Sequence, residues 1–410
     1  MRQDGRVNRI FLLLVLGLPW FASANSPAAE PAAVSGVMFA CTPAQIARLD
    51  RDMAAYLREL GVSERQVVRT APDDGTLVYT LATPEADTDT LGLKARKEYR
   101  IRDERVRLPA RGGKTRAVRA VSRKEILLAL LQHGRLTRFS GAACTLDALR
   151  EQVGVRQNVA AWTRQLSWVW PDGGPASWNT RVWRQGTPLA SVSLDRALQD
   201  PFLNQTRYGI GCYTASKLSY AHAVLDYYAR VRKDPAKAAL VRARLLHDQE
   251  PLVGVEPAAM WDFEKDFDPA TRAIPGKLLS IERGIPSRNF VPGDWAYLRN
   301  TDPATAEKTG YEGSNAVYLG GGIFADYYND HDHAYTYREK LDEVYQWRNG
   351  VFSRRRDGHK AKPLTDADFL RLGRTPAEGG LLLDYRAAPY FFGYEDLPQL
   401  PKSSTTVVDR

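Results

Sequence analysis

The chain has 410 residues, a formal net charge of +9 and three cysteines. A chain of this length can bury a sizeable core, and about two domains are expected from the length alone. Beyond the N-terminus no stretch approaches the ~18 consecutive apolar residues of a membrane span, which excludes a multi-span membrane protein. The basic balance favours encounter with anionic surfaces such as cell-wall polymers but identifies no chemistry, and no nucleic-acid-binding motif accompanies it.

The first 24 residues have the three parts of a secretory signal peptide. Three arginines form a basic start, residues 10–22 are apolar, and Ala22-Ser23-Ala24 matches the small-x-small cleavage pattern. An uncleaved anchor is the alternative, but the apolar run is short and Pro19 interrupts it. We therefore expect a periplasmic or secreted protein, without stable membrane insertion after cleavage, and a flexible leader over residues 25–36.

In an oxidising compartment, two of three cysteines can form a disulfide, and the third remains as a thiol whose role must be explained. We favour a Cys41–Cys144 bridge with Cys212 free. Such a bridge would close a loop of about 100 residues and add ~4–5 kcal/mol on the chain-entropy model. Three unpaired buried cysteines are the alternative.

Local signals predict the first elements. Thr42-Pro43 is typical of a helix start, and Gly61 can end that helix. Residues 77–82 are a strand candidate, Ser122 to Leu131 a short helix with a capping-box spacing, and residues 145–168 a longer helix. Five of the nine tryptophans follow between residues 162 and 183, which favours an aromatic core over a sugar-stacking surface.

Residues 94–124 hold 13 lysines and arginines against three acidic residues, with apolar residues among them. This pattern indicates a strand pair with a solvated basic face. A binding patch for an anionic polymer is the alternative.

The segment Gly209-Ile210-Gly211-Cys212 precedes a strong helical pattern that runs to about residue 232. Cys212 therefore lies in the first helical turn, where the dipole and the free amides favour a thiolate. The flanking glycines allow a sharp turn and a substrate backbone close to the sulfur. A small buried cysteine in a core helix is the alternative. His222 falls about 280° round the helix from Cys212, so we interpret it as structural.

Two turn-and-strand patterns follow, over residues 291–298 and 313–320. A helix with an N-terminal cysteine, then two strands with polar starts, is how papain-like cysteine enzymes of the cell-wall hydrolase type are built. The specific match comprises Cys212-Tyr213-Thr214-Ala215, Pro292-Gly293-Asp294, Tyr297, Asn300, Pro303, Gly313-x-Asn315 and Leu319-Gly320. In this order and spacing, these residues resemble the bacterial spore-coat type of transglutaminase, the protein-glutamine gamma-glutamyltransferase. The similarity covers about residues 200–330, and that family is a compact relative of the NlpC/P60 papain-like fold.

The resemblance implies an enzyme that uses a Cys thiolate and a Glu, without a cofactor, to join Gln and Lys side chains. Two positions depart from the pattern: Ser314 stands where the family has its catalytic Glu and where NlpC/P60 hydrolases have His, and Gly211 replaces the acidic residue before the nucleophile. Serine cannot act as that base at neutral pH. Glu312, which would share a strand face with Ser314, and Asp326 are the candidate replacements.

A third candidate base is the cluster Asp330-His331-Asp332-His333. The same cluster could ligate zinc, but no residues elsewhere complete a site with convincing spacing, so a solvated loop is the favoured interpretation. The segment from Tyr335 to Val351 follows as a helix.

The combined prediction is an exported α+β protein. A papain-like, NlpC/P60-like catalytic domain over residues 191–352 follows a mostly helical N-terminal region over residues 37–190, and residues 353–410 form a C-terminal extension. The expected reaction is acyl transfer from Gln through a Cys212 thioester, with Glu312 or Asp326 handling the protons. The expected partners are protein Gln and Lys side chains or cell-wall peptides, and no nucleic acid. A peptidoglycan amidase or endopeptidase on the same fold and an inactive envelope binding protein are the alternatives.

Overall fold

The computed structural model describes residues 35–73, 75–246, 252, 279–325, 327–329, 334–352 and 359–389. The expected signal peptide, Asp326 and the cluster of residues 330–333 lie outside these ranges. The helices are α1 (Pro43–Glu59), α2 (Arg123–Leu131), α3 (Leu146–Thr163), α4 (Leu194–Leu203), α5 (Cys212–Asp226), α6 (Pro235–Leu246), α7 (Pro303–Ala306), α8 (Tyr337–Trp347) and α9 (Asp366–Leu372). The strands are β1 (Gly36–Ala40), β2 (Val67–Asp73), β3 (Thr76–Leu81), β4 (Glu104–Pro109), β5 (Thr115–Ala120), β6 (Leu136–Ser140), β7 (Trp183–Arg184), β8 (Thr187–Pro188), β9 (Leu279–Arg283), β10 (Trp295–Arg299), β11 (Gly313–Gly320), β12 (Ile323–Ala325), β13 (Ala334–Thr336) and β14 (Tyr385–Pro389).

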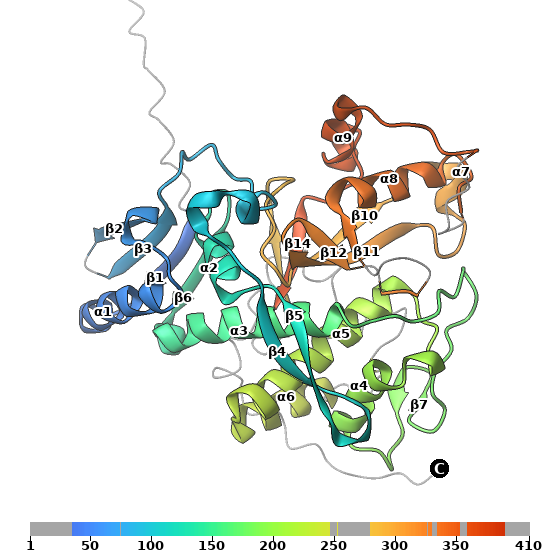
Figure 1. Ribbon diagram of the computed structural model, residues 1–410, viewed down its shortest axis with the longest axis horizontal. Coiled ribbons are helices and arrows are strands. Elements are labelled where there is room, and N and C mark those ends of the chain that lie inside the picture. Colours follow the sequence, from blue (N-terminus) through green and yellow to red (C-terminus); the bar gives the residue numbers. More distant parts are fainter. Residues whose placement is uncertain are drawn as a thin grey trace, which may run out of the picture. The chain divides into compact units, whose positions relative to one another are not determined.

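The sheet that positions the candidate site has six strands in the order β13-β12-β11-β10-β14-β9. Helices α3 and α5 cover one face, and α8 covers the other (Figure 1). Because strand residues alternate between faces, Val317 and Leu319 of β11 join the core that includes α5, whereas Ala316 and Tyr318 join the core that includes α8. Strand β14 comes from the segment expected to be a C-terminal extension, and it completes this sheet between β9 and β10.

Helix α5 is buried on all sides, because every residue from Thr214 to Asp226 is buried. A helix that packs on every face must lie in the middle of a fold, and α5 contacts α3, α4, α6 and β11. After Asp226 it continues as a π-helical turn over Tyr227–Arg232. The expected helix from Cys212 to about residue 232 is confirmed.

The N-terminal part contains a four-stranded sheet in the order β2-β3-β1-β6, packed with α1. Thr42 caps α1 through a capping box, with Pro43 at the first position, so that predicted helix start is confirmed. The strand at 77–82 and the short helix α2 are confirmed as well. The region is nevertheless mixed rather than mostly helical, because strands pair there over long sequence separations that local periodicity does not reveal.

A disulfide joins Cys41, next to β1, to Cys144, just before α3, with a Cα–Cα distance of 5.8 Å. Cys212 is the free cysteine. The predicted partition of the three cysteines is therefore confirmed. One hydrophobic core contains residues from both sides of position 190, including Val37, Val159 and Leu218, and the domain boundaries of the sequence analysis remain a prediction.

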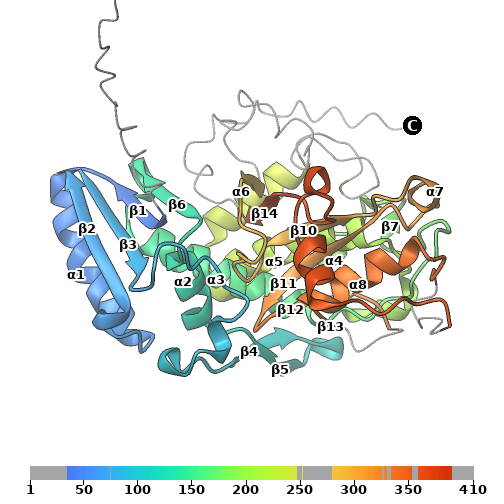
Figure 2. The same ribbon diagram turned by 90° about the horizontal axis from the view of Figure 1, so that it is seen from above.

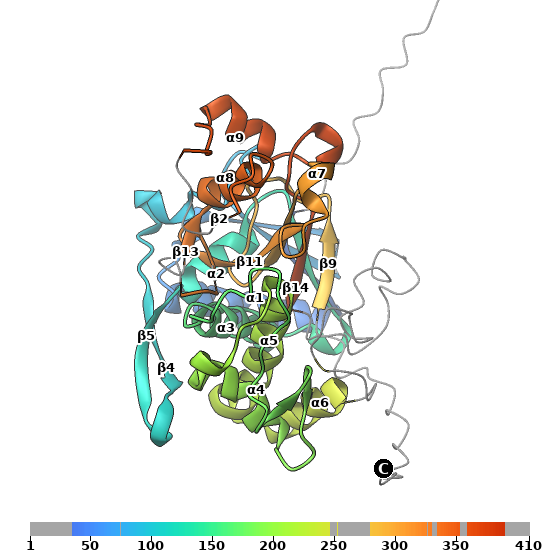
Figure 3. The same cartoon turned by 90° about the vertical axis from the view of Figure 1, so that its right-hand side faces the viewer.

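The basic stretch forms the antiparallel hairpin β4–β5, as the strand-pair interpretation predicted, together with 3-10 turns over Leu93–Ala95, Lys97–Tyr99 and Arg111–Gly113. The hairpin pairs with neither larger sheet, and it lies beside the α2 and α3 region (Figure 2, Figure 3). Arg105 and Arg107 point to solvent, while Leu108 and Val118 are buried. Part of the positive charge is neutralised locally, since Asp103 pairs with Lys94 and Arg119.

A buried ion cluster fixes the start of β10. The Asp294 carboxylate accepts hydrogen bonds from Arg156 at 2.8 Å and from Arg135 at 2.9 Å, and all three side chains are inaccessible to solvent or nearly so. Burial alone would raise the pKa of Asp294, but the two guanidinium groups outweigh it and hold that pKa below its usual value. Tyr220 of α5 donates to the carbonyl of Gly293, so the turn before β10 is tied to both α3 and α5.

Within the described ranges no helix is both long and apolar enough to cross a bilayer. The mixed α+β class expected from the sequence is confirmed.

Candidate active site

Cys212 is the first residue of α5, and Gly211 is its N-cap. Glycine offers no side chain to the first-turn N–H groups, and a Cβ at position 211 would meet no atom within 4 Å. The sulfur therefore lies at the positive end of a helix dipole, and no side chain of Gly211 covers the helix start. Cys212 itself is partly exposed, as a nucleophile must be.

Asn315 of β11 supplies two N–H groups to the Cys212 sulfur. Its backbone N and its side-chain Nδ2 both lie 3.5 Å from Sγ, within the longer range that applies to sulfur acceptors. Two converging donors stabilise negative charge on the atom that they face. This contact joins residues 103 positions apart and brings together the cysteine and the Gly313-x-Asn315 motif that the sequence analysis singled out.

Trp295 of β10 fixes the orientation of the Asn315 amide. Its indole Nε1 donates to Asn315 Oδ1 at 2.9 Å in a buried hydrogen bond. Because an indole N–H can only donate, the amide oxygen must face Trp295 and the NH₂ group must face the sulfur. Tyr213 packs on the Trp295 ring at a centroid distance of 5.5 Å, which adds a further contact from α5.

Tyr297 lies across the start of β11. A Cβ on Gly313 would come within 2.3 Å of the Tyr297 ring, so only glycine fits at the first residue of the strand. Burial raises the pKa of Tyr297, and negative charge on Cys212 and on Glu312 raises it further. Both of these residues therefore lie within electrostatic range of the same phenol.

Glu312 immediately precedes β11. Its carboxylate is exposed and accepts the backbone N–H of Gly310 at 2.9 Å, while its carbonyl accepts the N–H of Asn300. Among the described residues, the hydrogen-bond donors to the Cys212 sulfur both belong to Asn315. The candidate base is thus close in the chain but turned to a backbone partner, and its role stays a prediction, as does that of Asp326.

Ser314 lines a small cavity together with Cys212 and Asn315, with a volume of about 10 Å³, roughly the space of one water molecule. Lys340 of α8 lines the same cavity, and its buried ammonium pairs with Glu343 at 2.7 Å. Strand alternation places Ser314 on the same face as Ala316, toward α8, and Asn315 on the face toward α5.

His222 packs away from the sulfur, as the sequence analysis expected. Its ring lies against Trp162 and Phe202, at centroid distances of 4.4 and 4.6 Å. Burial lowers the pKa of His222 to about 4, so the ring is neutral at physiological pH. The tryptophan-rich region is likewise a core, since Trp162, Trp168 and Trp183 are fully buried.

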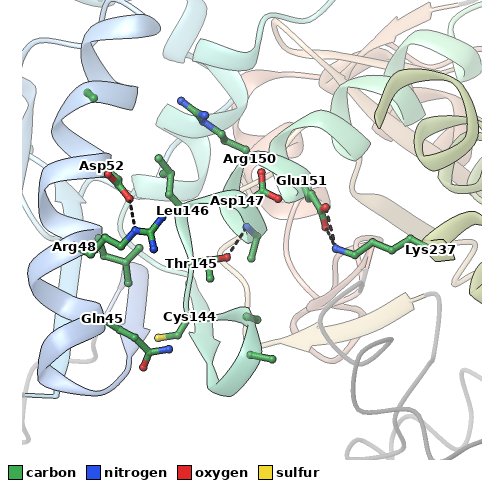
Figure 4. Close-up of a pocket in the computed structure, with 15 residues that line it drawn as sticks. Gln45, Arg48, Asp52, Cys144, Thr145, Leu146, Asp147, Arg150, Glu151 and Lys237 are labelled. Atoms are coloured by element: carbon green, nitrogen blue, oxygen red, sulfur yellow. Dashed lines mark hydrogen bonds and ion pairs between the residues drawn. The ribbon is translucent and has the colours of Figure 1, made fainter. Parts of the chain in front are cut away.

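A larger cavity of about 710 Å³ opens between α1 and α3 beside the disulfide (Figure 4). Some charged side chains of its lining form ion pairs with each other, since Arg48 lies 3.6 Å from Asp52 and Lys237 lies 3.0 Å from Glu151. The cysteine in its lining, Cys144, is oxidised. Cys212 does not line this cavity, so the lining provides no free thiol for nucleophilic attack.

Residues 175–331 match the family model of the protein-glutamine gamma-glutamyltransferases. This part of the chain is transglutaminase-like. The matched range includes Cys212, Trp295 and Asn315, and it confirms the resemblance seen in the sequence over about residues 200–330. The family match supports the prediction of a transglutaminase-like acyltransferase. The family implies protein Gln and Lys side chains as substrates.

Among solved structures, a transglutaminase from Geobacillus stearothermophilus, without its C-terminal extension, is similar at 17% identity. The similarity covers 61% of this chain and 95% of that chain, with a TM-score of 0.37. No curated protein is significantly similar to the chain.

Asn315 belongs to the recognisable Gly313-x-Asn315 motif, but the sequence alone indicates no role for its side chain at the transglutaminase-like site. Strand alternation alone shows that Asn315 and Ser314 point to opposite faces. It does not show which face meets α5, because that depends on how the sheet packs. The Trp at the start of β10, directly across the strand pair from Val317, gave no distinct signal either.

Proposed function

We propose that this protein is an exported protein-glutamine gamma-glutamyltransferase with a papain-like catalytic domain that works through a Cys212 thioester. The observation that carries the proposal is the pair of 3.5 Å contacts from Asn315 to a partly exposed sulfur at a helix start. A structural core cysteine has no need of two polar donors at its sulfur. Export is supported by the signal-like first 24 residues and by the disulfide.

In the proposed reaction the Cys212 sulfur attacks the side-chain carbonyl of a Gln residue. The carbon–nitrogen bond breaks, the leaving nitrogen takes up the proton that the Cys212 thiol has lost, ammonia departs, and an acyl thioester remains. A Lys amine then attacks the thioester carbonyl, loses a proton and releases the thiol, so that an isopeptide bond joins the two side chains. N–H groups at the start of α5 are suitably placed for the oxyanion of both tetrahedral intermediates.

The proton acceptor is the part of the mechanism that departs from the family. Ser314 stands in the position of the family's Glu, and we propose Glu312 or Asp326 as its replacement. Glu312 has the chemistry for this role, and its exposed carboxylate is one residue from the strand that carries Asn315. Rotation of Glu312 away from Gly310 would be required to bring its carboxylate toward the site.

The test is incorporation of a labelled primary amine into a Gln-donor protein by the mature chain. Cys212→Ser should abolish incorporation and leave the melting temperature nearly unchanged, because the two side chains are almost equal in size. Full activity in that variant would end the cysteine-enzyme interpretation. Release of ammonia without amine incorporation, or cleavage of purified sacculi, would instead identify a hydrolase that uses water as acceptor.

A further inference from the structure

Two consecutive tyrosines after β12, Tyr327 and Tyr328, hold the backbone on either side of Gly211. Tyr328 donates its phenol O–H to the carbonyl of Ile210 at 2.9 Å. Tyr327 lies 2.7 Å from Ser216, whose hydroxyl donates to the carbonyl of Cys212 at 2.9 Å. Both rings are 1% exposed, so these bonds are shielded from water.

The direction of each hydrogen bond can be assigned. Ser216 uses its own proton on the Cys212 carbonyl, which can only accept. Tyr327 must therefore donate to Ser216. The chain runs one way, from the Tyr327 hydroxyl through the Ser216 hydroxyl to the carbonyl of Cys212, the first residue of α5.

The Tyr327 phenol faces β11 two residues beyond Asn315, since the Val317 N–H contributes to the pKa of this phenol. Along one edge of a strand, alternate residues direct their N–H groups to the same side. Asn315 directs its N–H to the Cys212 sulfur, and Val317 directs its N–H toward the Tyr327 phenol, whose pKa it lowers. The edge of β11 that faces the Cys212 sulfur therefore also faces the phenol that, through Ser216, holds the Cys212 carbonyl.

The backbone at Tyr327 is held in an uncommon conformation. Its φ is +69°, a region that glycine adopts freely but that L residues other than Asn and Asp rarely adopt. Hydrogen bonds between Trp168 N and the Tyr327 carbonyl, at 2.8 Å, and between Asn329 N and the Trp168 carbonyl, at 2.9 Å, keep it in place. Such strain persists only where surrounding contacts over-determine the backbone, and it concentrates at functional sites.

We propose that Tyr327 and Ser216 are positioning residues that set the Cys212 sulfur against the two Asn315 donors. They act through the Cys212 backbone and touch no reacting atom. Only the turnover measurement rests on the proposed function. The alkylation rate of the Cys212 thiol reports the same positioning without any acyl substrate. Loss of either hydroxyl breaks the chain and frees the first turn of α5 to shift.

The chain offers matched controls. Ser219 is also a buried serine of α5 that donates to the carbonyl four residues earlier, at 2.9 Å, but the carbonyl is that of Ala215. Tyr318 is a buried tyrosine whose phenol bonds Gly322 N at the far end of β11. Ser219→Ala and Tyr318→Phe therefore remove comparable groups away from the sulfur.

The experiment measures the iodoacetamide alkylation rate of Cys212 from about pH 6 to pH 9, together with kcat, KM and the melting temperature. Ser216→Ala and Tyr327→Phe should each lower the alkylation rate near neutral pH and kcat by about tenfold, with KM changed less than about twofold, because a misplaced nucleophile costs rate rather than binding. The double variant should lose no more than the worse single variant, because both changes break one chain.

The controls should keep both rates within about twofold of wild type even where they lower the melting temperature. Equal losses in the control and target variants would overturn the proposal, as would target variants that are less stable but unchanged in alkylation rate. If Tyr327→Phe fails to fold, Ser216→Ala decides the question alone. A wild-type protein without amine incorporation would refute the proposed function, whereas the alkylation rates would still decide on the positioning role.

Discussion

The indole N–H of Trp295 lies 2.9 Å from Asn315 Oδ1, and this bond decides which end of the Asn315 amide faces the Cys212 sulfur. Asn315→Asp retains the acceptor for Trp295 but replaces the NH₂ donor with a second oxygen. We expect turnover to fall by about 10²-fold or more, the usual effect of removing one aligned donor. The melting temperature should change little, because the shape of the side chain is conserved.

Asn329→Asp is the control for added negative charge near the site, because Asn329 is exposed and follows Tyr328 in the chain. It should retain amine incorporation within about twofold. Near wild-type turnover of Asn315→Asp in the same assay would show that the 3.5 Å contacts do not contribute to the chemistry.

Asp294 should be among the most important single side chains for folding. Asp294→Ala leaves Arg135 and Arg156 buried without their shared carboxylate, which typically costs about 3–5 kcal/mol of unfolding free energy. Denaturant unfolding of the mature chain measures this loss. Asp52→Ala removes the exposed partner of Arg48 and should cost less than about 1 kcal/mol. Similar losses of unfolding free energy in Asp294→Ala and Asp52→Ala would show that the buried cluster stabilises the fold no more than an exposed ion pair does.

Glu125 should make folding stability depend on pH. Burial raises the pKa of Glu125 to about 7, although the N–H of Gly321 and the charge of Lys94 oppose the shift. The folded state therefore holds this proton more tightly than the unfolded state, whose pKa is near 4.5. The stability that the folded state gains by holding this proton is fully present below about pH 4.5, and it is lost as the pH rises to about 7.

A shift of this size corresponds to roughly 3 kcal/mol at most. Glu125→Gln retains an acceptor for Gly321 but cannot ionise. As the pH rises from about 4.5 to about 7, the unfolding free energy of Glu125→Gln should increase relative to that of the wild type. Glu85→Gln, at an exposed position, should show the same pH dependence as the wild type. Parallel pH profiles for Glu125→Gln and the wild type would refute the assignment.

The Cys41–Cys144 disulfide should stabilise the N-terminal sheet against the start of α3. It closes a loop with a sequence separation of 103, so its loss should cost about 2–5 kcal/mol. Cys41→Ser and Cys144→Ser should lower the melting temperature in non-reducing buffer to the value that the wild type shows with reductant. A wild-type melting temperature that reductant leaves unchanged would count against this. Non-reduced peptide mapping that finds Cys212 bonded to either partner would count against the bridge itself.

The elements that local signals specify were predictable from the sequence, and the contacts that join distant segments were not. Helix α1 has its capping box and Pro43 within four residues, and α5 has a helical pattern preceded by glycines. Strand β14, in contrast, is a short run that pairs with β9, about 100 residues earlier. Its alternation is too brief to distinguish it from a loop, and only the completed sheet gives it a partner.

The capping-box signal before α2 illustrates the same limit. Ser122 accepts the N–H of Glu125, as its spacing predicted. The Glu125 carboxylate does not return to Ser122 but bonds Gly321, because the turn between β11 and β12 reaches this helix in the folded protein. At the candidate site the cysteine was recognisable from its helix start, whereas Asn315 became recognisable only once β11 was placed against α5.

The last prediction concerns the proton acceptor that Ser314 cannot provide. A carboxylate beside a thiolate repels it, so a useful neighbouring carboxyl group must hold a proton and relay it. This role requires a raised pKa, which partial burial of the carboxyl group on substrate binding would provide. We expect Glu312→Gln or Asp326→Asn to lower turnover selectively by about 10²-fold or more, the usual size of a general-base contribution, and the greater effect from Glu312. His331→Gln and His333→Gln serve as the comparison. If only a histidine variant loses turnover, the site works as a Cys–His pair, and its closer functional analogues are hydrolases rather than enzymes with a Cys–Glu dyad.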